Sequence, residues 1–147
     1  MDEQVRAYLE PNHSAAMVTL RPDGRPHVAR VGVALVDGRL LSSGIPGRVR
    51  TGHLRRDPRA TLFVFDPANP LSWLGLEADV TILEGPDAPE LSLRLFQEMQ
   101  RGMSPSPAPG NLLWNGEEKR PEEFLRVMAE ERRLVYEFEI LRSYGRF

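Results

Sequence analysis

Five arginines are concentrated between residues 48 and 59, beside hydroxyl and imidazole side chains. The stretch follows an apolar segment that ends near Ser43, passes a turn marked by glycine and proline, and contains one or two basic helical turns that end at Pro58. Free N–H groups at the start of a helix donate hydrogen bonds to anions, and nearby arginines add positive charge. The pattern therefore indicates a candidate phosphate site, with a solvated helix face as the alternative, at Arg48, Arg50, Arg55, Arg56 and Arg59.

The sequence lacks the motifs of several common catalytic and nucleotide-binding sites. The Gly-x-Ser-x-Gly pattern of serine hydrolases is absent, as are the P-loop and the Gly-x-Gly-x-x-Gly dinucleotide fingerprint. The three histidines, His13, His27 and His53, occur singly, without the spacing of metal ligands. The residues predict an anion-binding domain with no catalytic acid or base and no metal site, which is typical of a protein whose cofactor carries the chemistry.

The composition is that of an ordinary globular protein, and it narrows the choice of partners. With 147 residues, 41% hydrophobic and 27% charged, the chain is expected to form one domain over residues 1–147. The absence of cysteine excludes disulfides and thiolate sites. A formal net charge of -2 argues against nucleic acid as a partner. Because no apolar run reaches membrane-spanning length and the N-terminus is unlike a signal peptide, we expect a cytoplasmic protein without a membrane partner.

Alternating apolar residues, a near-continuous apolar run and a stretch of small and β-branched residues predict six strands, with short helices between them. Asp23-Gly24 and Asp37-Gly38 are strong hairpin signals between the first three strands. We therefore expect a mainly β (α+β) fold, a six-stranded antiparallel barrel with short helices on its rim, because closing the sheet removes its edges. An open α+β sandwich is the alternative. The expected strands are Ser14 to Leu20, His27 to Val36, Arg39 to Ser43, Ala60 to Phe65, Trp73 to Leu83 and Arg133 to Ile140, and the expected helices besides the basic turns are Asp2 to Glu10, Pro89 to Arg101 and Pro121 to Glu131.

The segment from Gly102 to Gly116 is rich in proline, serine and glycine, and we expect it to be a loop. It contains an apolar patch formed by Leu112, Leu113 and Trp114. Such a composition suits a flap over a flat aromatic ligand. The alternative is that the patch packs on the body of the domain.

The stretch from Val18 to Phe65 resembles the core of the pyridoxamine 5'-phosphate oxidase-like split β-barrel superfamily. More narrowly, it is similar to the flavin/deazaflavin oxidoreductases of the B branch, many of which use coenzyme F420, an 8-hydroxy-5-deazaflavin. The resemblance covers nearly the whole chain. The features that carry it are the hairpin Asp23-Gly24-Arg25-Pro26-His27, the pair Arg48 and Arg50, the run Leu54-Arg55-Arg56-Asp57-Pro58-Arg59, and Arg132-Arg133-Leu134-Val135-Tyr136 followed by Tyr144-Gly145.

The resemblance implies an FMN-binding type of split barrel that forms a homodimer, with two equivalent cofactor sites at the subunit interface. It assigns the cofactor phosphate to Arg48 and Arg50, and adds the hydroxyls of Ser43 and Thr51. The backbone of Arg30 to Val33 and of Ser42 to Gly44 would line the ring. The expected cofactor-binding residues are Arg30, Val31, Ser43, Gly44, Arg48, Arg50, Thr51 and His53.

From this resemblance we expect an F420-dependent oxidoreductase. It would transfer a hydride between the reduced cofactor and a small conjugated organic acceptor. Two alternatives stay open: an oxidoreductase with FMN in place of F420, and a non-catalytic protein that binds flavin, haem or another small ligand.

Overall fold

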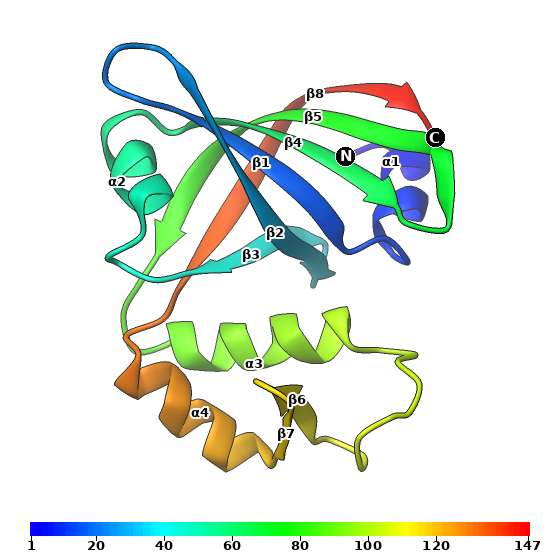
Figure 1. Ribbon diagram of the computed structural model, residues 1–147, viewed down its shortest axis with the longest axis vertical. Helices are drawn as coiled ribbons and strands as arrows, with labels where there is room; N and C mark the ends of the chain where they lie inside the picture. Colours follow the sequence, from blue (N-terminus) through cyan, green and yellow to red (C-terminus); the bar gives the residue numbers. More distant parts are fainter.

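Six antiparallel strands form the larger part of the molecule, which a computed structural model describes over all residues 1–147. They pair in the order β1-β2-β3-β8-β5-β4, and β4 pairs back onto β1, so the sheet closes on itself (Figure 1). The prediction of a mainly β fold with six antiparallel strands is confirmed. The strands are β1 (Ser14–Leu20), β2 (Pro26–Val36), β3 (Arg39–Gly44), β4 (Arg59–Asp66), β5 (Asn69–Leu83) and β8 (Leu134–Arg146).

The barrel interior is filled by side chains from alternate positions of the strands. Because side chains alternate across a strand, every second residue of β1 and β4 is buried. Burial of this apolar surface is the main stabilising term of the fold. The largest fully buried side chains of this core include Leu9, Met17, Leu40, Leu62, Leu74, Leu76 and Tyr136.

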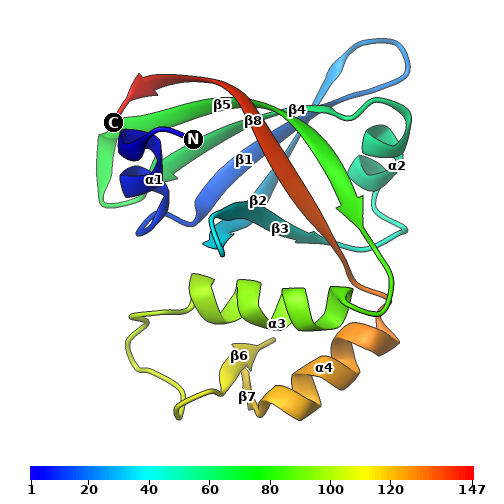
Figure 2. The same cartoon turned by 180° about the vertical axis from the view of Figure 1, so that it is seen from behind.

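Two short helices lie at opposite ends of the barrel (Figures 1 and 2). The helix α1 (Glu3–Leu9) is capped by Asp2, whose carboxylate accepts a hydrogen bond of 2.8 Å from the Val5 N–H, and it buries Val5 and Leu9. The helix α2 (Val49–Arg56) is the basic segment, and it lies at the other end, between β3 and β4 in the chain. None of the helices combines the length and apolar character needed to cross a membrane.

The remaining elements form a layer beside the barrel, which we call the helical layer (Figure 2). It consists of α3 (Ala88–Met99), α4 (Pro121–Glu130) and the hairpin of β6 (Leu112–Trp114) and β7 (Glu117–Lys119). The expectation that all helices lie on the rim of the barrel is therefore wrong for α3 and α4. Helix α3 packs on the outer face of the sheet, where Leu95 joins an apolar cluster with Ala34, Val36, Leu41 and Val135.

The last strand is longer than expected, because β8 continues to Arg146. Clear apolar alternation stops at Ile140, but pairing with β5 continues from Arg142 after an irregularity opposite Glu77 and Ala78. Backbone hydrogen bonds to β5 hold these residues in the sheet, and such bonds leave no mark in the side-chain pattern.

Candidate functional site

The strands β2 and β3 separate beside the start of the basic helix. They pair only from Val33 opposite Ser42 to Val36 opposite Arg39. Before Val33, β2 pairs with β1 alone, and after Ser42, β3 pairs with β8 alone. The Ser42 hydroxyl donates a hydrogen bond of 2.7 Å to the Gly32 carbonyl, where the ladder ends. The edges of β2 and β3 that face each other are thus unpaired next to the turn that leads into α2.

A buried tyrosine anchors the first turn of α2. The Thr51 hydroxyl donates to the Ile45 carbonyl at 2.8 Å and shares a hydrogen bond of 2.5 Å with the Tyr136 hydroxyl. Thr51 and Tyr136 are both fully buried. The Tyr136 ring passes so close to Gly44 that a β-carbon there would overlap its hydroxyl. Gly44 therefore leaves room for Tyr136, and Tyr136 in turn positions the helix.

The five arginines predicted to gather at this turn separate into two groups. Three of them are engaged within the chain: Arg55 binds both oxygens of Glu84 at 2.7 and 3.0 Å, Arg59 binds Asp57, and Arg56 donates to the Leu20 carbonyl. These three contacts fit the alternative of an ordinary surface role.

Arg48 and Arg50 form the second group, because neither side chain makes an ion pair or donates to a backbone carbonyl. Arg48 is the N-cap residue of α2 and is exposed, whereas Arg50 is half-buried. Burial lowers the pKa of Arg50, and the like charges of Arg48 and Arg133 lower it further, against an opposing effect of Tyr136. The guanidinium still remains charged at neutral pH.

Two buried donors at this place have no partner inside the chain, Arg50 Nε and Ser43 Oγ. Buried polar atoms are nearly always hydrogen-bonded, so these two donors are suited to an acceptor from outside the chain, either water or an anion. The donor set, two guanidinium groups and one hydroxyl, fits the oxygens of a phosphate group.

Three other residues expected to bind the cofactor, Arg30, Val31 and His53, lie on β2 and α2. Arg30 is exposed on β2, and the Val31 side chain belongs to the barrel core, so only its backbone is available. His53 is buried under α2, where its Nδ1 lies 2.9 Å from the Thr19 hydroxyl and its ring meets His27 edge to face at 5.2 Å. Burial, followed by the neighbouring positive groups, lowers the pKa of His53. It forms no hydrogen bond with Arg48 or Arg50.

The apolar patch in the segment from Gly102 to Gly116 is part of a core and does not form a flap. Leu112 is fully buried, and Trp114 packs edge to face on Phe96 and Phe124 at 5.2 and 5.5 Å. The Gln100 side chain bonds both the N–H and the carbonyl of Leu113 at 2.8 Å. The alternative of packing on the domain was therefore the correct interpretation, because α3 and α4 supply an aromatic cluster that receives the patch.

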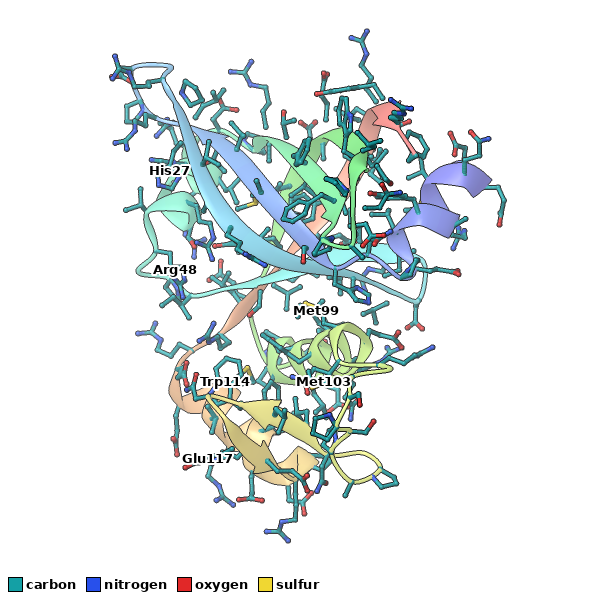
Figure 3. All side chains as sticks on the ribbon, turned by 45° about the vertical axis from the view of Figure 1, so that its right-hand side comes forward. His27, Arg48, Met99, Met103, Trp114 and Glu117 are labelled. Carbon is teal, nitrogen blue, oxygen red and sulfur yellow. The ribbon has the colours of Figure 1, made fainter.

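The sequence pointed to two residues near the site, Tyr136 and Arg133, only as part of a run that carries the family resemblance, and it assigned neither of them to the site. The contact between Tyr136 and Thr51 joins positions 85 residues apart, which no local pattern reveals. The Arg133 guanidinium stacks over the Trp114 ring at 4.9 Å from its centroid. In Figure 3, Arg48 lies between the part of the barrel that carries His27 and the helical layer that carries Trp114.

The fold and the arrangement of the basic turn define a small antiparallel β-barrel protein with a helical layer on one side. The sequence profile described as pyridoxamine 5'-phosphate oxidase matches residues 1–136, and the chain belongs to this family. At the level of the family, this is a flavin oxidoreductase-type fold. No curated protein matches the chain.

Solved structures with similar folds have diverse descriptions. One called F420 reductase has a TM-score of 0.69 at 19% identity, with 98% of each chain covered. A conserved hypothetical protein from Mycobacterium tuberculosis has a TM-score of 0.70 at 19% identity, covering 97% of this chain and 82% of that one. A heme binding protein from Mycobacterium smegmatis has a TM-score of 0.64 at 15% identity, covering 99% of this chain and 54% of that one. At these identities the likeness establishes the fold alone.

Proposed function

We propose that the protein is an F420-dependent oxidoreductase that transfers a hydride between the reduced deazaflavin and a small conjugated organic acceptor. The observation that carries the proposal is the unpaired Arg48 and Arg50, with the buried donors Arg50 Nε and Ser43 Oγ, at the place where β2 and β3 separate. Membership of a flavin-type family supports it, as does the fold shared with a protein called F420 reductase.

In this proposal the protein binds and orients the cofactor. Arg48, Arg50 and the N-terminal end of α2 bind the phosphate. Thr51 holds the first turn of α2 in place and does not bind the phosphate itself, because its hydroxyl already bonds Ile45 and Tyr136. The ring lies along backbone of β2 and of the end of β3. The bound deazaflavin supplies the hydride chemistry, and no side chain is assigned as an acid or base.

A second copy of the chain is part of the proposal. The outer face of β4, β5 and β8 exposes Phe63, Leu141 and Tyr144 to 43, 61 and 42%, and Phe63 stacks on Trp73 at 5.5 Å. Apolar aromatic surface of this kind is typical of an interface. A homodimer would bury it and complete two equivalent cofactor sites. Sedimentation of the wild type and of Phe63→Glu tests this part: a dimer that becomes a monomer supports it, and a wild-type monomer at micromolar concentration contradicts it.

The cofactor assignment is tested by titrating the apoprotein separately with F420 and FMN, followed by fluorescence. Preferred binding of F420, together with steady turnover of an artificial acceptor by the reduced complex, supports the proposal. Preferred binding of FMN would assign the other cofactor within the same class. Tight binding without turnover would indicate a non-catalytic ligand-binding protein.

A further inference from the structure

Arg133 lies near the turn that carries the candidate phosphate site, although it comes much later in the sequence than Arg48 and Arg50. It directly precedes β8, whose first residue Leu134 is paired with Gly44. Arg133 therefore lies one residue beyond the end of the pairing, next to Ile45 and the turn that leads to Arg48. Arg133 and Pro46 of that turn line the same surface hollow of about 540 Å³. The acid that shares this hollow, Glu84, is bound through both oxygens by Arg55.

The Arg133 side chain is held in one orientation. Its Nε and Nη2 both donate to the same oxygen of Glu131, at 3.0 and 2.8 Å. Its guanidinium stacks on the Trp114 ring at 4.9 Å, and only 13% of the side chain is exposed. An arginine that is already ordered loses less conformational entropy when it binds a ligand.

One terminal nitrogen of Arg133, Nη1, makes no hydrogen bond within the chain. The positive charge of Arg133 also contributes to lowering the pKa of Arg50, after burial and the charge of Arg48. Of the three arginines Arg48, Arg50 and Arg133, only Arg133 is paired with a carboxylate, that of Glu131. The site thus has positive charge on two sides, from the start of α2 and from the junction of α4 and β8.

We propose that Arg133 is a second anion-binding point, which selects ligands with another negatively charged group beyond the phosphate bound at Arg48 and Arg50. This inference rests on the proposed function and deepens it. F420 carries glutamate carboxylates beyond its phosphate, whereas the phosphate of FMN is terminal. Arg133 is therefore a residue that determines specificity for F420 over FMN.

The test uses two substitutions that separate charge from packing. Arg133→Met keeps an unbranched side chain on Trp114 but removes the charge and the donors, and Arg133→Lys keeps the charge. Arg126→Met is the matched control, because Arg126 is an exposed arginine of α4 without an ion-pair partner. Dissociation constants for F420 and FMN are measured by fluorescence titration of each apoprotein, with thermal unfolding measured in parallel.

We expect Arg133→Met to weaken F420 binding about tenfold, the effect of losing one charged hydrogen bond, and to leave FMN binding within about twofold of the wild type. Arg133→Lys recovers part of the F420 affinity, and the control changes neither constant. Unchanged F420 affinity in Arg133→Met, or an equal loss for both cofactors, overturns the proposal.

A second measurement keeps the inference separate from the proposed function. If the wild type binds neither cofactor, the proposed function fails, but inorganic ions still test Arg133. Tripolyphosphate carries several anionic groups, and orthophosphate carries one. We expect Arg133→Met to lose the extra thermal protection that tripolyphosphate gives over orthophosphate. Equal protection of the variant and the wild type by tripolyphosphate would mean that Arg133 is not an anion-binding point.

Discussion

Replacing Thr51 by valine removes the contact that ties the basic helix to the barrel core. Valine has nearly the same shape and helix propensity as threonine, so the change deletes a hydroxyl and little else. That hydroxyl bonds the Ile45 carbonyl and the Tyr136 hydroxyl, and both Thr51 and Tyr136 are fully buried. In the variant, the Tyr136 hydroxyl loses its hydrogen bond with Thr51 and has no access to water.

The loss of unfolding free energy depends on which buried groups keep a hydrogen-bond partner. Thr51→Val leaves one buried hydroxyl unsatisfied and deprives a carbonyl of one donor, so it should cost about 2.5 kcal/mol of unfolding free energy. Tyr136→Phe leaves Thr51 bonded to Ile45 and should cost about 1 kcal/mol. With both changes no hydroxyl is stranded, so the double variant should lose about 2 kcal/mol, less than the sum of the single losses by about 1.5 kcal/mol.

Urea unfolding with linear extrapolation measures these free energies, and an unchanged slope confirms that the variants unfold as the wild type does. Thermal midpoints should fall by about 2–4 °C for each kcal/mol lost. Thr61→Val is the matched control, because Thr61 lies on the outer side of β4 without a side-chain hydrogen bond, and it should change stability by less than about 0.5 kcal/mol. Additive losses in the double variant would refute the shared hydrogen bond as the anchor of α2.

Three further predictions concern the phosphate site, the helical layer and acid stability. Arg50→Ala should weaken F420 binding by about 2 kcal/mol while the apoprotein melts as before; equal affinity in a titration would refute the site. Trp114→Ala should lower the unfolding free energy by about 3 kcal/mol, measured in urea, because it empties the aromatic cluster between α3 and α4. The pKa of His53 is lowered from its usual 6.5 by burial, so the unfolded chain binds the proton more readily and stability is lost as pH falls below about 6.5. Unfolding at pH 7.5 and 5.5 should show a smaller difference in His53→Gln than in the wild type.

Local patterns were enough to predict most strands, because each barrel strand buries every second residue. The small and β-branched residues of β1 predicted its bounds from Ser14 to Leu20 without error. Asp37 and Gly38 also behave as the hairpin signal indicates, since both have positive φ, at 52° and 75°. These features depend on neighbours in sequence, and a sequence shows such neighbours directly.

The pairing of distant strands left no comparable signal. Strand β3 pairs with β8, about ninety residues later in the chain, and Gly44 has to be a glycine only because of that pairing. The end of β8 is held by backbone hydrogen bonds to β5 rather than by apolar alternation. Such features follow from the closed sheet as a whole.

The sequence predicted the candidate site as a concentration of five arginines. The structure separates those that bind other groups of the chain from those that do not. Sequence spacing does not reveal that Arg55 reaches Glu84 on another element, or that Arg50 is partly enclosed. The same limit explains Trp114, whose cluster is supplied by two helices that lie on either side of it in sequence. The residue types indicated an anion, the family resemblance assigned Arg48 and Arg50, and the structure leaves both without an ion pair.

The helical layer has an apolar core of its own, formed by Leu93, Leu112, Phe124 and Met128, distinct from the core inside the barrel. The two cores can therefore change independently during evolution. A change in the length of the segment between α3 and β6 leaves every strand register of the barrel untouched. A side chain at Gly44, in contrast, would collide with Tyr136 and disturb the pairing of β3 with β8. Homologues can therefore diversify the layer while the barrel and its arginine turn persist.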